Sequence, residues 1–270
     1  MRRSVAAWLA AAALAALGGP VHAQISDDVV KIAVLDDMSG VYADITGQGG
    51  VLAARMAVED FGGKVLGKPI EVVFGDHQNK ADIGAALTRQ WYDVEKVDMI
   101  TGLGNSAVAL AVQQITRDKN RINLVSGAAT TDLTGKACSP NGVHWTYDTY
   151  ALAKGTGTAV VKNGGSEWFF LTADYAFGHS LENNVSTIVK AAGGKVVGSA
   201  RHPLNTPDFS SFLLTAQSSG AKVIGLANAG GDTINSIKQA AEFGITRKGQ
   251  QLAGLLVMIT DIHALGLKTA

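Results

Sequence analysis

Strand-like apolar runs alternate with helical patterns along most of this chain, and this alternation limits the fold more than any other feature. In the first half the runs cover residues 29–35, 70–75, 99–102 and 122–126, and the helical patterns cover residues 47–61, 81–94 and 106–119. The first helical pattern places Val51, Ala54, Val58 and Phe61 on one face. Strands that alternate with helices predict a parallel sheet covered by helices.

The same alternation starts again in the second half. Helical patterns cover residues 150–163, 178–192, 208–219 and 233–243, and strand-like runs cover residues 168–172, 195–201, 223–226 and 252–258. Residues 127–148, between the halves, show no clear period. We therefore predict an α/β fold of two lobes, each a parallel sheet covered by helices, with residues 24–147 in the N-terminal lobe and residues 148–270 in the second.

The first 23 residues have the pattern of a secretory signal peptide. Arg2 and Arg3 precede an apolar run at 5–17, and small residues at 21 and 23 precede Gln24. The run has about thirteen residues, too few to span roughly 30 Å of hydrocarbon, so an uncleaved anchor is the weaker alternative. The arginine pair alone is only a hint of twin-arginine export. We expect cleavage after Ala23 and a periplasmic product.

The composition excludes several kinds of partner. Lys and Arg number 23, and so do Asp and Glu, so the chain lacks the basic excess that nucleic acids or anionic membranes require. Apolar residues reach 47%, which is enough for a sizeable core, but no later segment is long and apolar enough for stable membrane insertion. Cys138 is the single cysteine, so we expect a free thiol; a partner in a longer chain is the alternative.

Ligands of open parallel sheets bind outside the carboxyl ends of the strands. The residues there include the segment 36–42 and the loop 103–106, where Asn105 or Ser106 either caps the next helix or offers backbone N–H groups to a carboxylate. The small residues and hydroxyls of 126–131 form either a close backbone approach to a ligand or a plain tight turn.

Aromatic and acidic side chains also gather at the expected strand ends. Tyr42 and Tyr175 are candidates for the walls of a cleft, as are Trp145, Tyr147, Tyr150 and Phe177. Asp232 and Asp261 are placed to hold a ligand ammonium, although helix capping is the commoner role for each.

Enzymatic patterns are weak in this chain. Gly102-x-Gly104-x-x-Ala107 resembles a dinucleotide fingerprint, but the acid that should follow the next strand, roughly 20 residues on, is missing at Ser126-Gly127. There is no G-x-S-x-G elbow and no P-loop, and the histidines lack metal-ligand spacing. We expect no catalytic residue, no metal and no cofactor.

The ordered set of motifs resembles a known family. Residues 30–35, then Met38-Ser39-Gly40, then a Gly-rich helix start that leads to Ala57-Val58-Glu59-Asp60, are similar to the branched-chain amino acid (leucine-binding) type of periplasmic substrate-binding protein of ABC transporters. The segments 104–106, 126–133, 174–178 and 237–244 follow in the family's order, so the resemblance covers the whole mature chain.

This resemblance implies a type I periplasmic binding fold whose two ligand-binding lobes close on a small carboxylate, an amino acid or an aromatic acid, and deliver it to ABC transporter permease subunits. It implies that Ser106, Ala129 and Thr130 hold the carboxylate. It also implies that Tyr175 and the strand ends at Asn228, Ala229 and Thr260 contact the ligand from the second lobe. Ser39, Tyr42, Asn105 and Asp261 complete the expected ligand-binding set, around one hollow shared by Ser106, Thr130 and Tyr175.

Of these expectations, the chemical class of the ligand is the least determined. Amino-acid binders of this type often use a glutamate for the amino group; no glutamate matches, and Asp261 is nearest by position. The opening 37–44 resembles more closely the branch that takes aromatic acids such as benzoate or hydroxycinnamate derivatives. An extracytoplasmic sensor module that feeds a membrane receptor is the alternative function.

The family usually continues well beyond residue 270, so we expect a C-terminally truncated chain with an incomplete second lobe. An open sheet edge and exposed apolar surface would follow. We therefore expect weak stability, with loss of ligand binding as the more severe outcome.

Overall fold

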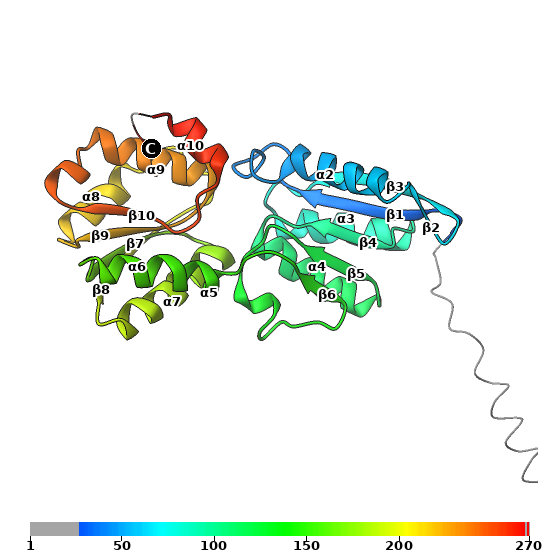
Figure 1. Cartoon of the computed structure of the whole chain (residues 1–270), viewed down its shortest axis with the longest axis horizontal. Helices are drawn as coiled ribbons and strands as arrows, with labels where there is room; N and C mark the ends of the chain where they lie inside the picture. The colour runs from blue at the N-terminus through cyan, green and yellow to red at the C-terminus, as the bar shows by residue number, and fades with distance from the viewer. Residues whose placement is uncertain (1–26, 268, 270) are drawn as a thin grey trace, which may run out of the picture.

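The protein contains two parallel sheets, each with helices packed on it (Figure 1). The computed structural model describes residues 27–267 and 269; the expected signal peptide lies outside the described residues. The first sheet has the strand order β2-β3-β1-β4-β5-β6. Its strands are β1 (Val30–Asp36), β2 (Lys64–Val65), β3 (Lys68–Asp76), β4 (Met99–Gly102), β5 (Ile122–Val125) and β6 (Gly142–His144). Only the β2–β3 pair within this sheet is antiparallel.

Three helices accompany the first sheet, and together with it they form what we call the first lobe: α2 (Gly47–Asp60), α3 (Ala81–Asp93) and α4 (Ser106–Asp118). Alternate residues of a strand face opposite sides of the sheet. Accordingly, Ala33 and Leu35 of β1 pack into one buried core with residues of α3 and α4, while Ile32 and Val34 face α2.

The second sheet has the order β10-β9-β7-β8, with every pair parallel. Its strands are β7 (Glu167–Ala173), β8 (Lys195–His202), β9 (Val223–Ala227) and β10 (Gln251–Gly254). With it pack α5 (Thr149–Leu152), α6 (Thr158–Lys162), α7 (Ala176–Ala191), α8 (Ser210–Ser218), α9 (Gly230–Glu242) and α10 (Ile259–Leu265), and these elements form the second lobe.

The core of the second lobe lies on both faces of its sheet. Trp168 and Phe170 of β7 pack toward α7, whereas Phe169 and Leu171 pack with residues of α8 and β9. The first of these clusters also contains Tyr42 and Ala129 of the first lobe. The two lobes therefore share part of one apolar core beside the carboxyl ends of β1 and β7.

The elements follow the predicted alternation with local differences. The strand expected at 252–258 ends at Gly254, because Leu255 and Leu256 turn out of the sheet and pack into the core shared by the lobes. The helix expected at 150–163 is interrupted by a π-helical turn at Ala153–Gly157. Two short strands, β2 and β6, were not predicted, since two or three residues are too few to show a period.

Candidate ligand-binding site

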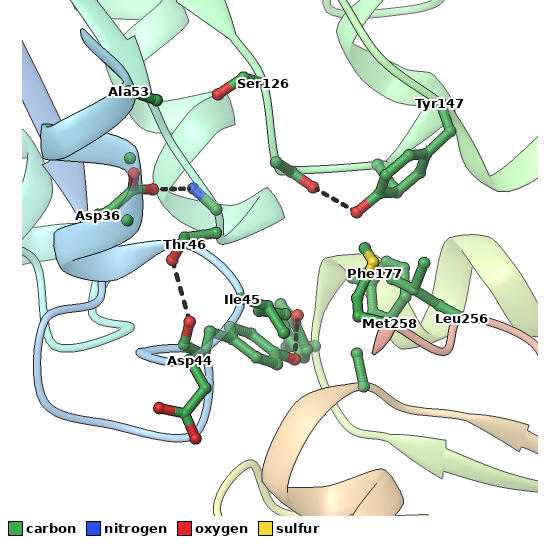
Figure 2. Close-up of a pocket in the computed structure, with 18 residues that line it drawn as sticks. Asp36, Asp44, Ile45, Thr46, Ala53, Ser126, Tyr147, Phe177, Leu256 and Met258 are labelled. Carbon is green, nitrogen blue, oxygen red and sulfur yellow. Dashed lines mark hydrogen bonds between the residues drawn. The ribbon is translucent and has the colours of Figure 1, made fainter. Parts of the chain in front are cut away.

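A hollow of about 340 Å3 lies between the carboxyl ends of the two sheets, and residues of both lobes line it. Figure 2 shows Asp36, Thr46 and Ala53 on one side and Tyr147, Phe177, Leu256 and Met258 on the other. Its lining residues are Asp36, Tyr42, Asp44, Ile45, Thr46, Gly49, Gly50, Ala53, Gly104, Ser126, Gly127, Ala129, Tyr147, Tyr175, Phe177, Ala229, Leu256 and Met258. Its volume falls in the range of small-molecule sites.

Tyr42 and Tyr175 join the two lobes at the wall of this hollow. Their phenolic oxygens are 2.7 Å apart and share a hydrogen bond. Burial raises the pKa of both phenols, so both stay protonated at neutral pH. Beside them, Gly231 N donates a backbone hydrogen bond of 3.1 Å to Val41 O. The loop after β1 therefore reaches across to the start of α9.

The side chain of Asp37 holds that loop in one conformation through hydrogen bonds. Its carboxylate accepts hydrogen bonds from the backbone N–H of Gly40 at 2.8 Å and of Tyr42 at 2.9 Å, and from the Asn79 side chain. A buried carboxylate with several donors holds its surroundings in one arrangement. The hydrogen bonds to Asp37, the first residue after β1, thus fix the backbone that positions the Tyr42 ring.

Asp36, one residue earlier, lies in the wall of the hollow. It is 2% exposed, and its Oδ1 accepts a hydrogen bond of 2.8 Å from Gly104 N. Burial raises the pKa of this carboxyl to about 7, with a further contribution from the negative charge of Asp37. Gly102 has a φ of +90°, and a Cβ at that position would lie 2.4 Å from Asp36 Oδ2. Glycine there leaves room for the acid.

Four of the eleven expected site residues line the hollow: Tyr42, Ala129, Tyr175 and Ala229. Two expected carboxylate contacts, Ser106 and Thr130, lie behind its wall, where Ser106 Oγ accepts a hydrogen bond of 3.3 Å from Thr130 N. Asn105 caps α4, since its side chain accepts from the N–H groups of Ala107 and Val108. Instead, Gly104 of the expected loop and Ala129 of the expected turn line the hollow.

Most of the other expected residues have structural partners; the buried hydroxyl of Thr260 has none in the described chain, and Thr260 does not line the hollow. Asn228 is buried; its Oδ1 accepts from Thr233 Oγ1, and its Nδ2 lies 3.2 Å from His202 Nε2. Asp261 accepts from Met258 N at the start of α10, in agreement with the capping role. Ser39 donates to Asp76 at the surface. Asp232 accepts from the N–H groups of Asn205 and Thr206 rather than facing the hollow.

Sequence reasoning did not nominate Thr46, Leu256 or Met258, and it included Asp36 and Ser126 only as members of the strand-end segments 36–42 and 126–131. Asp36 and Ser126 stand directly at predicted strand ends, which is a usable signal. Leu256 and Met258 were assigned to a strand, so their position in the wall depends on the early end of β10.

The hollow contains acids but no cationic group. Asp36 and Asp44 are the only charged residues in its described lining, and Asp44 is exposed. The available donors are neutral. Within the described chain, no hydrogen bond occupies the backbone N–H of Gly127 or of Ala129, and both residues line the hollow. Backbone N–H groups that lack a protein partner are suited to a ligand oxygen.

Two kinds of feature are absent from the described residues. No cluster of three or more His, Cys, Asp or Glu side chains suited to a metal ion occurs among them. No helix in the part of the chain that the structure covers combines the length and apolar character needed to cross a membrane.

Two α/β lobes around a shared hollow define the two-lobed architecture of the type I periplasmic binding fold. In agreement, residues 29–270 match the model of the family described as "Periplasmic binding protein", and the chain belongs to this family.

Solved structures and curated relatives extend the comparison. A periplasmic binding protein from Burkholderia mallei is 61% identical with a TM-score of 0.88, over 90% of this chain and 64% of that one. An ABC transporter solute-binding protein from R. palustris in complex with 4-hydroxybenzoate is 27% identical with a TM-score of 0.81, over 89% of this chain and 66% of that one. The Leu/Ile/Val-binding protein homolog 7 of Brucella suis biovar 1 is 28% identical over 87% of this chain. The chain spans 60% of that relative's length.

Proposed function

We propose that this protein captures a small carboxylate in the hollow between its lobes, in the periplasm, and delivers it to the permease of an ABC transporter. One observation carries the proposal: residues of both lobes line a single hollow, and Tyr42 and Tyr175 close one of its walls across the lobes. A site of this kind needs only a difference in affinity between open and closed lobes. The proposal places the boundary between the two ligand-binding lobes between residues 147 and 148.

The lining favours an aromatic acid. Four rings, those of Tyr42, Tyr147, Tyr175 and Phe177, line the hollow and offer flat apolar surface to a ring. The carboxylate would bind the free N–H groups of Gly127 and Ala129, since no cation lines the described site. The R. palustris neighbour, which holds 4-hydroxybenzoate, supports this class.

A branched-chain amino acid is the second candidate. The Brucella relative is named as a Leu/Ile/Val-binding protein, and Ile45, Leu256 and Met258 would pack against an aliphatic side chain. Asp261 does not offer its carboxylate to the hollow, so an ammonium group would have to meet Asp36 or Asp44.

Isothermal titration calorimetry of this chain with 4-hydroxybenzoate and with L-leucine tests the proposal. Ala53→Trp should block the hollow, because Ala53 is exposed on α2 and lines it. Ala57→Trp, one turn along the same exposed surface, is the matched control because Ala57 does not line the hollow. We expect binding that Ala53→Trp weakens by at least about tenfold and that Ala57→Trp leaves unchanged.

Two outcomes would contradict the proposal. If neither compound binds, or if Ala53→Trp binds as the unmodified chain does, the hollow is not the capture site. Tight leucine binding with no heat from 4-hydroxybenzoate would overturn the aromatic assignment alone.

A further inference from the structure

Asp36 is a buried acid in the hollow that capture of a carboxylate does not use. It ends β1 and is held in place by the hydrogen bond from Gly104 N to its Oδ1. Within the described chain, no hydrogen bond reaches its second oxygen, Oδ2. Cβ atoms at Gly50 and Gly102 would lie 3.0 and 2.4 Å from Oδ2, so the two glycines give this acid its space.

The charges around Asp36 make a donor the natural partner for it. Every other charged group near it is negative: Asp37 is adjacent in sequence, and Asp44 lies in the same lining. A buried acceptor left unpaired costs free energy, and a second anion beside it adds repulsion. A ligand group that donates a hydrogen bond removes the first cost without adding the second.

We propose that Asp36 is a specificity-determining residue that accepts a hydrogen bond from a hydroxyl group on the ligand's ring, so that the hollow selects hydroxylated aromatic acids over unsubstituted ones. This inference rests on the proposed function, because it requires an aromatic acid in this hollow. The ligand then has two anchors of opposite character. Its carboxylate takes the free N–H groups at Gly127 and Ala129, and its hydroxyl donates to Asp36.

The assignment differs from a general preference for polar ligands. Ser126 and Thr46 also line the hollow, and their hydroxyl protons go to Gly102 O and Tyr42 O. Their oxygens can still accept a hydrogen bond, but a neutral hydroxyl is a weaker acceptor than a carboxylate. Asp44 is exposed, so water competes for its carboxylate. Among the side chains that line the hollow, Asp36 alone combines burial with an acceptor oxygen that has no partner in the described chain.

The test measures binding of benzoate, 3-hydroxybenzoate, 4-hydroxybenzoate and 4-methoxybenzoate by calorimetry. The preference is the Kd of benzoate divided by that of the better hydroxybenzoate. At pH 8, above the pKa of about 7, Asp36 is mostly ionised, and we expect a preference of about tenfold or more in the unmodified chain, as for a hydrogen bond to a buried charged group. Asp36→Ala should lower it to about twofold or less, whereas Asp60→Ala, which removes an exposed acid outside the lining, should keep it.

The ligand series protects the test against a variant that fails to fold. 4-Methoxybenzoate cannot donate, so it should bind the unmodified chain no more tightly than benzoate does. A preference that survives Asp36→Ala, or a methoxy compound that binds as tightly as 4-hydroxybenzoate, overturns the role of Asp36 and leaves solute capture standing. If no aromatic acid binds, the proposed aromatic ligand and this inference both fail.

Discussion

Tyr42, in the loop after β1, and Tyr175, at the start of α7, share a hydrogen bond of 2.7 Å between their phenolic oxygens, although 133 positions separate them in the chain. Both rings pack against the apolar core that the lobes share. Under the proposed function, in which the lobes close on a ligand, the free energy of this contact would count toward closure and toward ligand affinity.

Removing one hydroxyl of this pair should weaken ligand binding. Tyr175→Phe leaves the Tyr42 hydroxyl buried without its partner, which costs about 1 to 3 kcal/mol, or roughly five- to hundredfold in Kd. The double variant Tyr42→Phe with Tyr175→Phe should lose less than the two single losses combined, because it leaves no orphaned hydroxyl. Calorimetry with 4-hydroxybenzoate measures all three, and Tyr150→Phe is the control, since Tyr150 is 52% exposed. Purely additive losses would show that the two hydroxyls act independently.

The close approach of the lobes also depends on Gly230. Its φ is +56°, and a Cβ there would lie 2.4 Å from Val41 O, the atom that accepts from Gly231 N. Gly230→Ala should therefore lower the free energy of unfolding by roughly 1 to 3 kcal/mol and weaken ligand binding. Gly193→Ala separates the contact from the backbone strain, since Gly193 has a φ of +90° with nothing within 4 Å of its Cβ position. Equal thermal shifts for the two variants would show that contact with Val41 does not matter.

Much of the fold follows from the apolar period of the sequence. β4 and the start of α4 lie where the pattern places them, because a buried strand and an amphipathic helix leave strong periodic signals. The site was harder to predict. Asp36 and Asp37 are neighbours in one acidic pair, and a difference of a single residue decides which of them faces the hollow and which folds the loop. The contact between Tyr42 and Tyr175 depends on how the two sheets pack against each other, and the local sequence pattern does not predict that packing.

Asp36 should make the protein less stable as the pH rises. Its folded pKa is raised to about 7 from 3.8, so the folded state binds more protons than the unfolded state between these values. Stability therefore falls as the pH rises from 4 to 7, by at most about 4 kcal/mol. Asp36→Asn cannot ionise, so at pH 8 it should melt at a higher temperature than the unmodified chain. At pH 4 the two should melt alike. Melting curves across this range, with Asp44→Asn as the exposed-acid control, test this, and a variant that melts lower at pH 8 would contradict it.

His77 should make the protein more stable as the pH rises, opposite to the effect of Asp36, over part of the same pH range. It is fully buried, its Nδ1 accepts from Asn79 N at 3.0 Å, and its Nε2 has no partner in the described chain. Burial lowers the pKa of His77 to about 4 from 6.5, although Asp37 and Asp76 oppose the shift. The unfolded state then binds more protons between pH 4 and 6.5, so stability falls as the pH drops through this window. His77→Gln keeps a neutral side chain and should remove this acid-side loss, whereas His263→Gln, at an exposed histidine, should leave it unchanged. Burial also raises the pKa of Asp232 to about 6, so Asp232 acts in the same direction as Asp36. Between pH 4 and 6.5, stability should therefore fall more steeply with rising pH in His77→Gln than in the unmodified chain, and less steeply in Asp36→Asn.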